Sequence, residues 1–264
     1  MIAIHLTTAQ TILSVISGGL VGFTLGLIGG GGSILAVPLL LYVVGIHDAH
    51  VVIGTTALAV AVNAFVNLIP HWRAGHVRWK AAILFAIPGA VGAVLGSFIG
   101  KMVDGKALLF LFAILMLVIA IQMLRKKQVD QQDTARQQIK IGPVLGTGAA
   151  TGMISGFFGI GGGFLIVPGL ILATGMTMID AIGSSLFSVG TFGLTTAISY
   201  ALSGLVDWWV FLLYVIGGIL GGIGGALLSN RLGKNKRTLQ IVFSMIIIIV
   251  AIYMLYDNLS TLHW

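Results

Sequence analysis

The sequence predicts an all-α, polytopic transmembrane protein made of two inverted repeats, each with a broken or re-entrant helical hairpin and three spanning helices. Composition is the first of three observations behind this fold class. Of the 264 residues, 58% are apolar and only 8% are charged, and the mean hydropathy is +1.09. A soluble domain carries about 25% charged residues. The sequence therefore excludes a soluble enzyme and a disordered chain, because most of the surface must meet lipid.

An internal repeat is the second observation, and it decides the architecture. The glycine pattern of residues 22–32 recurs at residues 152–162, an offset of 130. After a gap of one residue, Gly-Thr-Thr at 54–56 matches Gly-Ser-Ser at 183–185, an offset of 129. The chain is accordingly divided into a first transmembrane repeat at 1–124, a polar cytoplasmic linker at 125–141 and a second transmembrane repeat at 142–264.

Segment lengths are the third observation. The first repeat has apolar arms near 10–28 and 33–46 and spans near 51–70, 80–100 and 106–124. The second has arms near 144–158 and 163–175 and spans near 181–202, 208–229 and 238–256. About 20 residues cross a hydrocarbon core of about 30 Å, whereas each second arm reaches only roughly 20 Å as a helix. Each pair of arms is therefore predicted to form a re-entrant hairpin.

Basic residues indicate how the segments are oriented. If each repeat is one hairpin plus three spans, the loops 71–80, 125–141 and 230–237 share one side and hold 12 of the 14 basic residues. The positive-inside rule makes that side cytoplasmic. Four crossings per repeat would divide the basic residues eight to six, so the inverted arrangement is favoured. Two full crossings per hairpin give the same parity, so ten spans remain open.

The tips of the two hairpins are the predicted binding site. We call residues 29–33 the first glycine segment and residues 159–163 the second glycine segment. Each precedes a short apolar helix whose first N–H groups and positive dipole end point back into the break. Two such helix starts near the midplane would bind an anion without a charged side chain. The predicted backbone ligands are Gly31, Gly32, Ser33, Gly161, Gly162 and Gly163.

A tight helix crossing is the alternative explanation for these glycines. It is favoured for Gly22, Gly26, Gly152 and Gly156, whose spacing is typical of helix contact. It is not favoured for the glycine segments, because each glycine costs a helix about 1 kcal/mol relative to alanine. No Lys, Arg, Asp or Glu lies inside any segment, so an anion is favoured over a metal cation.

Polar side chains on the following spans complete the predicted site. The candidates are Thr55, Thr56 and Asn63 in the first repeat and Ser184 and Ser185 in the second. Hydroxyl and amide groups at helical spacing could line one pathway and donate hydrogen bonds to an oxyanion. The alternative, given equal weight, is that these groups join helices or bond to carbonyls of their own helix.

Other kinds of site have no support in the sequence. It holds no zinc-protease, nucleophile-elbow or P-loop motif and no suitable carboxylate pair, so we expect no catalytic residue, no metal and no cofactor. The formal charge of +7 comes from short loops between apolar segments, which argues against nucleic acid. The expected partners are the lipid bilayer and a small anion, and a homodimer stays open.

Residues 22–38 (GFTLGLIGGGGSILAVP) and their copy at 152–168 (GMISGFFGIGGGFLIVP) resemble the TauE/SafE family of bacterial membrane permeases. IGTT at 53–56 and IGSS at 182–185 are similar to that family's G-T-S element. The resemblance covers nearly the whole chain. It implies a multi-pass permease of the bacterial inner membrane that moves sulfite, thiosulfate, sulfoacetate or a related sulfonate, most often in export.

The two copies of the pattern are not identical. Ser33 and Thr56 stand where the second copy has Gly163 and Ser185, so selectivity is expected to depend on that difference. Two other classes of function remain as alternatives to a transporter. An anion channel would share the same site but leave a continuous pore, and a non-transporting membrane partner subunit would need no paired glycine segments.

Overall fold

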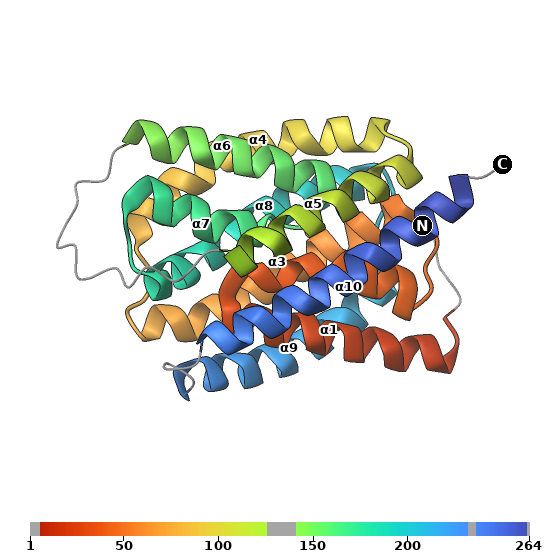
Figure 1. The fold of residues 1–264 in the computed structure, drawn as a ribbon, viewed down its shortest axis with the longest axis horizontal. Coiled ribbons are helices and arrows are strands. Elements are labelled where there is room, and N and C mark those ends of the chain that lie inside the picture. The colour runs from red at the N-terminus through yellow and green to blue at the C-terminus, as the bar shows by residue number, and fades with distance from the viewer. Residues whose placement is uncertain (1–5, 126–140, 232–235, 263–264) are drawn as a thin grey trace.

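The computed structural model describes residues 6–125, 141–231 and 236–262, and every regular element within these ranges is helical (Figure 1). The first half holds α1 (Thr8–Ile28), η1 (Gly29–Leu35), α2 (Ala36–Pro38), η2 (Leu39–Val43), α3 (Ala49–Arg73), α4 (Trp79–Met102) and α5 (Gly105–Arg125). The second half holds α6 (Ile141–Phe158), α7 (Gly163–Thr174), α8 (Met178–Leu202), α9 (Trp208–Arg231) and α10 (Lys236–Leu262). The predicted linker at 125–141 lies almost wholly outside the described residues.

The lengths of the helices confirm a multi-pass, all-α protein. Seven stretches of the described residues are long and apolar enough to cross a membrane. The predicted spans coincide with helices whose ends differ by a few residues. For example, the span expected near 51–70 is α3. The second arm of the second half is α7, whose 12 residues reach about 18 Å and fall short of the roughly 30 Å of a bilayer core.

Helices α3 and α8 form the centre of the molecule. They pack against each other, with α4 and α6 along one edge and α1 and α9 along the opposite edge (Figure 1). In each central helix, 72% of the most apolar window is buried inside the protein, against 39–50% in the other candidate spans. Most residues of α3 and α8 are therefore shielded from lipid, and most of their polar side chains face protein.

Small residues hold the two edge pairs together in equivalent ways. A side chain on Gly22 of α1 would overlap the backbone of Gly218 in α9, and one on Gly152 of α6 would overlap that of Gly89 in α4. These contacts correspond through the offsets of the internal repeat, with the halves exchanged. Close helix packing therefore explains Gly22 of α1 and Gly152 of α6. The opposite orientation of the halves in the membrane stays a prediction.

Polar side chains begin several of the helices. The Asp48 carboxylate accepts hydrogen bonds from the N–H groups of His50 and Val51 at 2.9 and 3.1 Å, which starts α3. The Asp207 carboxylate likewise accepts from the second and third residues of α9 at 2.9 Å. Such caps satisfy N–H groups that a helix start leaves without partners. Asp48 and Asp207 therefore serve as caps at the starts of α3 and α9.

Each half folds back on itself at its glycine segment. In the second half, Gly162 lies against Ser155, and Gly169 lies near Thr151, about one turn earlier in α6. In the first half, the chain returns to the start of α1, where a Cβ on Gly45 would lie 3.9 Å from the Gln10 amide nitrogen. The first arm thus returns to the start of α1, as a re-entrant hairpin requires, and α7 runs back along α6 at least as far as Thr151.

Candidate functional site

The first glycine segment differs from the expected open break. It forms a 3-10 helix, η1, which follows α1 directly after a turn at Gly29 with φ of +76°. The Ser33 hydroxyl donates to the Gly30 carbonyl at 3.0 Å, and the N–H of Ala36 donates to the Ser33 carbonyl. The predicted helix start at Ser33 is therefore absent, because 3-10 hydrogen bonds carry the chain through the glycines.

The second glycine segment contains the predicted helix start. Gly159, Gly161 and Gly162 have φ of +63° to +67°, a left-handed conformation that strongly favours glycine. Helix α7 then begins at Gly163, and no side chain caps it. The N–H groups of Leu165 and Ile166 share the Gly162 carbonyl at 2.9 and 3.1 Å. The second half therefore presents a helix N-terminus at the tip of its hairpin.

The two glycine segments meet in the interior. A Cβ on Gly163 would overlap the Gly30 carbonyl, and a Cβ on Gly30 would overlap the backbone of Gly163. This contact explains why Gly163 stands where the first half has Ser33, because any side chain there would separate the segments. Val60 of α3 and Val189 of α8 flank the contact, each 3.2 Å from the position of a Cβ on Gly161.

Ser185 joins the central helix α8 to the first glycine segment. Its hydroxyl accepts a hydrogen bond of 3.4 Å from the N–H of Gly30 and donates to the Ile182 carbonyl at 2.8 Å. Its counterpart Thr56 instead donates to carbonyls of its own helix, at 2.7 and 3.2 Å. Of this predicted pair, Ser185 is the member that the structure joins by a hydrogen bond to a glycine segment.

Thr55 and Ser184 make contacts between helices, which was one of the two roles considered for them. The Thr55 hydroxyl accepts from the N–H of Asp207 at 2.9 Å, and the Ser184 hydroxyl accepts from the N–H of Arg78 at 2.9 Å. Both N–H groups lie just before a helix of the other half, α9 or α4. These hydroxyls therefore join the two halves at equivalent helix starts, which is the alternative that the sequence left open.

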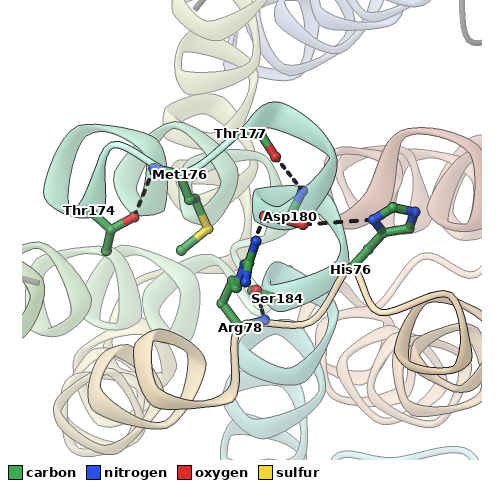
Figure 2. A network of polar contacts seen from close by, with 7 residues as sticks. All are labelled: His76, Arg78, Thr174, Met176, Thr177, Asp180 and Ser184. Carbon is green, nitrogen blue, oxygen red and sulfur yellow. Dashed lines mark hydrogen bonds and ion pairs between the residues drawn. The ribbon is translucent and has the colours of Figure 1, made fainter. Parts of the chain in front are cut away.

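A charged network surrounds one of these junctions and was not predicted. Figure 2 shows the Asp180 carboxylate of α8 between two side chains of the α3–α4 loop. The Arg78 Nε donates to it at 2.8 Å, and the His76 Nδ1 lies 3.7 Å away. Position 51, which corresponds to Asp180 in the first half, holds valine, so this ion pair belongs to one junction alone. The sequence signal for this network was Asp180, an acidic residue at the start of the span expected near 181–202.

Asn63 is fully buried, and neither atom of its carboxamide has a hydrogen-bond partner among the described residues. It lies against Gly218 of α9, where a side chain would overlap the amide. The corresponding residue of the second half is Phe192, which fills the equivalent notch at Gly89 of α4. An unpaired buried amide costs about 1–3 kcal/mol, so a polar group at this place needs an explanation.

Buried hydroxyls without a described partner form a second group, beyond the eleven predicted site residues. Its members are Ser17, Ser155, Ser188, Thr196, Ser199 and Tyr200. Ser155 of α6 is completely buried and is the one of these that lies against a glycine segment. Its oxygen is 2.8 Å from the position that a Cβ on Gly162 would take.

Charge is absent from the hairpins themselves. No Asp, Glu, Lys or Arg occurs in residues 1–47 or 141–174. Within the described ranges no three His, Asp or Glu side chains gather as a metal site would require. All eleven predicted site residues are buried. The positive end of α7 and the buried hydroxyls are thus the polar features of the hairpin tips.

Comparison with known proteins identifies a family and relatives that match nearly the whole chain. Residues 14–254 match the family described as "Sulfite exporter TauE/SafE". A "Probable membrane transporter protein" of Xylella fastidiosa (strain 9a5c) is 50% identical over 262 residues, covering 97% of this chain and 99% of that protein. One of Haemophilus influenzae is 29% identical, covering 92% and 97%. YunE of Bacillus subtilis, with the same description, is 25% identical, covering 91% and 96%.

Proposed function

Because this chain belongs to the sulfite exporter TauE/SafE family, we propose that it exports a small sulfur-containing oxyanion such as sulfite, thiosulfate, sulfoacetate or another sulfonate. The family and the relatives make it a multi-pass membrane transporter of the bacterial inner membrane. Their names describe transport rather than catalysis. The substrate, the direction and the binding site are the proposed part.

The meeting of the two glycine segments is the observation that carries this proposal. Gly30 and Gly163 touch backbone to backbone in the interior, beside the uncapped start of α7. A helix start offers N–H groups and a positive dipole end, which together favour an oxyanion. The absence of charged residues from both hairpins leaves a neutral site, suited to a small anion that must also be released.

The same contact favours a transporter with moving parts over an open channel. At Gly163 there is no room even for a methyl group, and Val60 and Val189 stand on either side. A continuous pore through this point would require the segments to separate. Alternating access follows if one hairpin and its edge helices move against the central pair α3 and α8, opening the segments first to one side and then to the other.

Transport in proteoliposomes tests the proposal. We expect saturable uptake of radiolabelled sulfite or thiosulfate that is accelerated by unlabelled anion on the opposite side. In inverted vesicles, whose cytoplasmic face points outward, export should appear as uptake into the vesicle. Gly163→Ala should reduce the rate at least tenfold, since the new methyl group displaces Gly30. Gly146→Ala is the matched control, because nothing lies within 4 Å of a Cβ at that position of α6.

Three results would contradict this function. Single-channel currents without counterflow would indicate the anion channel. Failure of sulfite, thiosulfate, sulfate, sulfoacetate and taurine to shift the melting temperature of the purified protein, together with no transport, would favour a partner subunit. Transport by Gly163→Ala at the rate of the control would remove the glycine segments from the site.

A further inference from the structure

We propose that the anion is held by the second half alone, at the N-terminus of α7, and that the Ser155 hydroxyl is its side-chain ligand. This inference rests on the proposed function and specifies its binding site. In the symmetric arrangement both glycine segments would contribute equally. Here the anion site consists of the N-terminus of α7 and Ser155 alone, and we call it the one-sided seat. The ligand class is an oxyanion with several acceptor oxygens, as in sulfite or a sulfonate group.

The two glycine segments differ in the donors that they offer. The first continues from α1 as η1, and two of its possible donors are already engaged. Its Ser33 hydroxyl donates to the Gly30 carbonyl, and the Gly30 N–H donates to Ser185. The second ends at a true helix start, where Gly162 provides the cap position without any side-chain hydrogen bond. Free N–H groups and the positive end of a dipole are therefore concentrated at α7.

Ser155 is an independent sign of a ligand at the same place. Serine and threonine hydroxyls in these helices usually bond to a carbonyl one turn earlier, as Thr147, Thr151 and Thr191 do at 2.6–2.8 Å. Ser155 makes no such bond, although it is completely buried. Its oxygen instead lies against Gly162, the residue that precedes α7. A donor left unsatisfied there is available to a bound oxyanion.

The first half has no equivalent of this hydroxyl. The repeat offset places Leu25 where the second half has Ser155. The neighbouring Thr24 does approach Gly32, but its hydroxyl already bonds to carbonyls of α1 at 2.9 and 3.0 Å. The two hairpins therefore differ in their side chains as well as in their backbone conformation. Both differences favour the second hairpin as the anion site.

Ser155→Ala tests the seat in the purified full-length protein. Without anion we expect its melting temperature to equal or exceed that of the original protein, because the variant removes an unpaired buried hydroxyl. With sulfite or sulfoacetate as the probe, the dissociation constant should rise about tenfold to a hundredfold, as expected for a lost hydrogen bond to a charged group. Transport should fall with it.

Two control variants make the result specific. Ser17→Ala removes another fully buried, unpaired hydroxyl, from α1 about 18 Å of helix before Gly29. Ser33→Ala removes the hydroxyl of the first glycine segment. Ser17→Ala should bind the probe within about twofold of the original protein, since its hydroxyl lies far from the seat. Ser33→Ala should lose much less affinity than Ser155→Ala if the seat is one-sided, and as much if both glycine segments contribute equally.

Each outcome decides between the two proposals. Loss of binding in Ser155→Ala alone supports the one-sided seat. Normal binding by Ser155→Ala, or equal losses in Ser155→Ala and Ser33→Ala, overturns it while the proposed function stands. If the original protein binds and transports none of the probes, the proposed function fails, and the seat fails with it.

Discussion

Asn63 and Phe192 occupy equivalent positions, yet one presents an unpaired amide and the other an apolar ring to the opposing glycine notch. Burial of an amide without a partner is unfavourable, whereas the phenylalanine fills the same space at no such cost. The sequence identified Asn63 as a candidate because asparagine is expensive in lipid. Its contact with Gly218, and the absence of a described partner, come from the tertiary structure.

Asn63→Leu tests whether the Asn63 amide is needed for transport or only for packing. We expect the variant to melt at the same temperature as the original protein or higher, because about 1–3 kcal/mol of desolvation is relieved. Anion transport should fall at least tenfold. Asn67→Leu is the control, since the Asn67 amide donates to the Asn63 backbone carbonyl at 2.8 Å and its loss should lower stability. A less stable Asn63→Leu protein that transports normally would make the amide structural.

Helices α4 and α9 start at equivalent junctions that are built from different groups. Thr55 and Ser184 each accept one backbone N–H from the other half, so both junctions share a hydroxyl. The ion pair of Arg78 and Asp180 reinforces the junction at α4 alone (Figure 2). The two otherwise equivalent junctions therefore differ by one ion pair.

Asp180→Asn tests the contribution of that ion pair. The Arg78 side chain is 63% exposed and that of Asp180 only 9%, so solvent screens the pair and its loss should cost at most about 1 kcal/mol of stability. The difference from the original protein should shrink in high salt. Arg73→Ala, at the exposed end of α3, is the control and should change little. A larger loss that salt does not reduce would indicate a mainly structural role for the carboxylate.

Across the whole molecule, matched contacts join the halves, with α1 on α9 and α4 on α6. Gly75 and Gly204 are equivalent loop residues, each with φ near +75° and nothing within 4 Å of an added Cβ. The chain has no cysteine, so a single introduced thiol reports the side on which it lies.

Gly75→Cys and Gly204→Cys test the inverted topology. We expect an impermeant thiol reagent applied outside intact cells to label Cys at 204 and not at 75, and the reverse in inverted vesicles. The positive φ should reduce stability by roughly 1–2 kcal/mol in both variants, which leaves them comparable. Labelling of both from one side would overturn the inverted arrangement.

Residue composition and order were enough to predict the all-α membrane fold, which the structure confirms. The division into two repeats and the hairpin topology stay predictions. A bilayer leaves a chain without strands few alternatives to helices, and helix length follows directly from the run of apolar residues. The repeat was equally visible, because its glycines are required wherever two backbones approach closely. These properties depend on residue type and order alone.

The partners of the polar groups, by contrast, emerge from the folded structure. Thr55 and Ser184 were candidates either for the anion site or for joining helices, and each accepts an N–H just before a helix of the other half. The first glycine segment was expected to open and instead continues as η1. Ser155 was not singled out, because a buried serine usually bonds to its own helix. A hydroxyl's partner is set by the neighbours that folding brings to it, and one repeated sequence pattern can therefore yield two unequal sites.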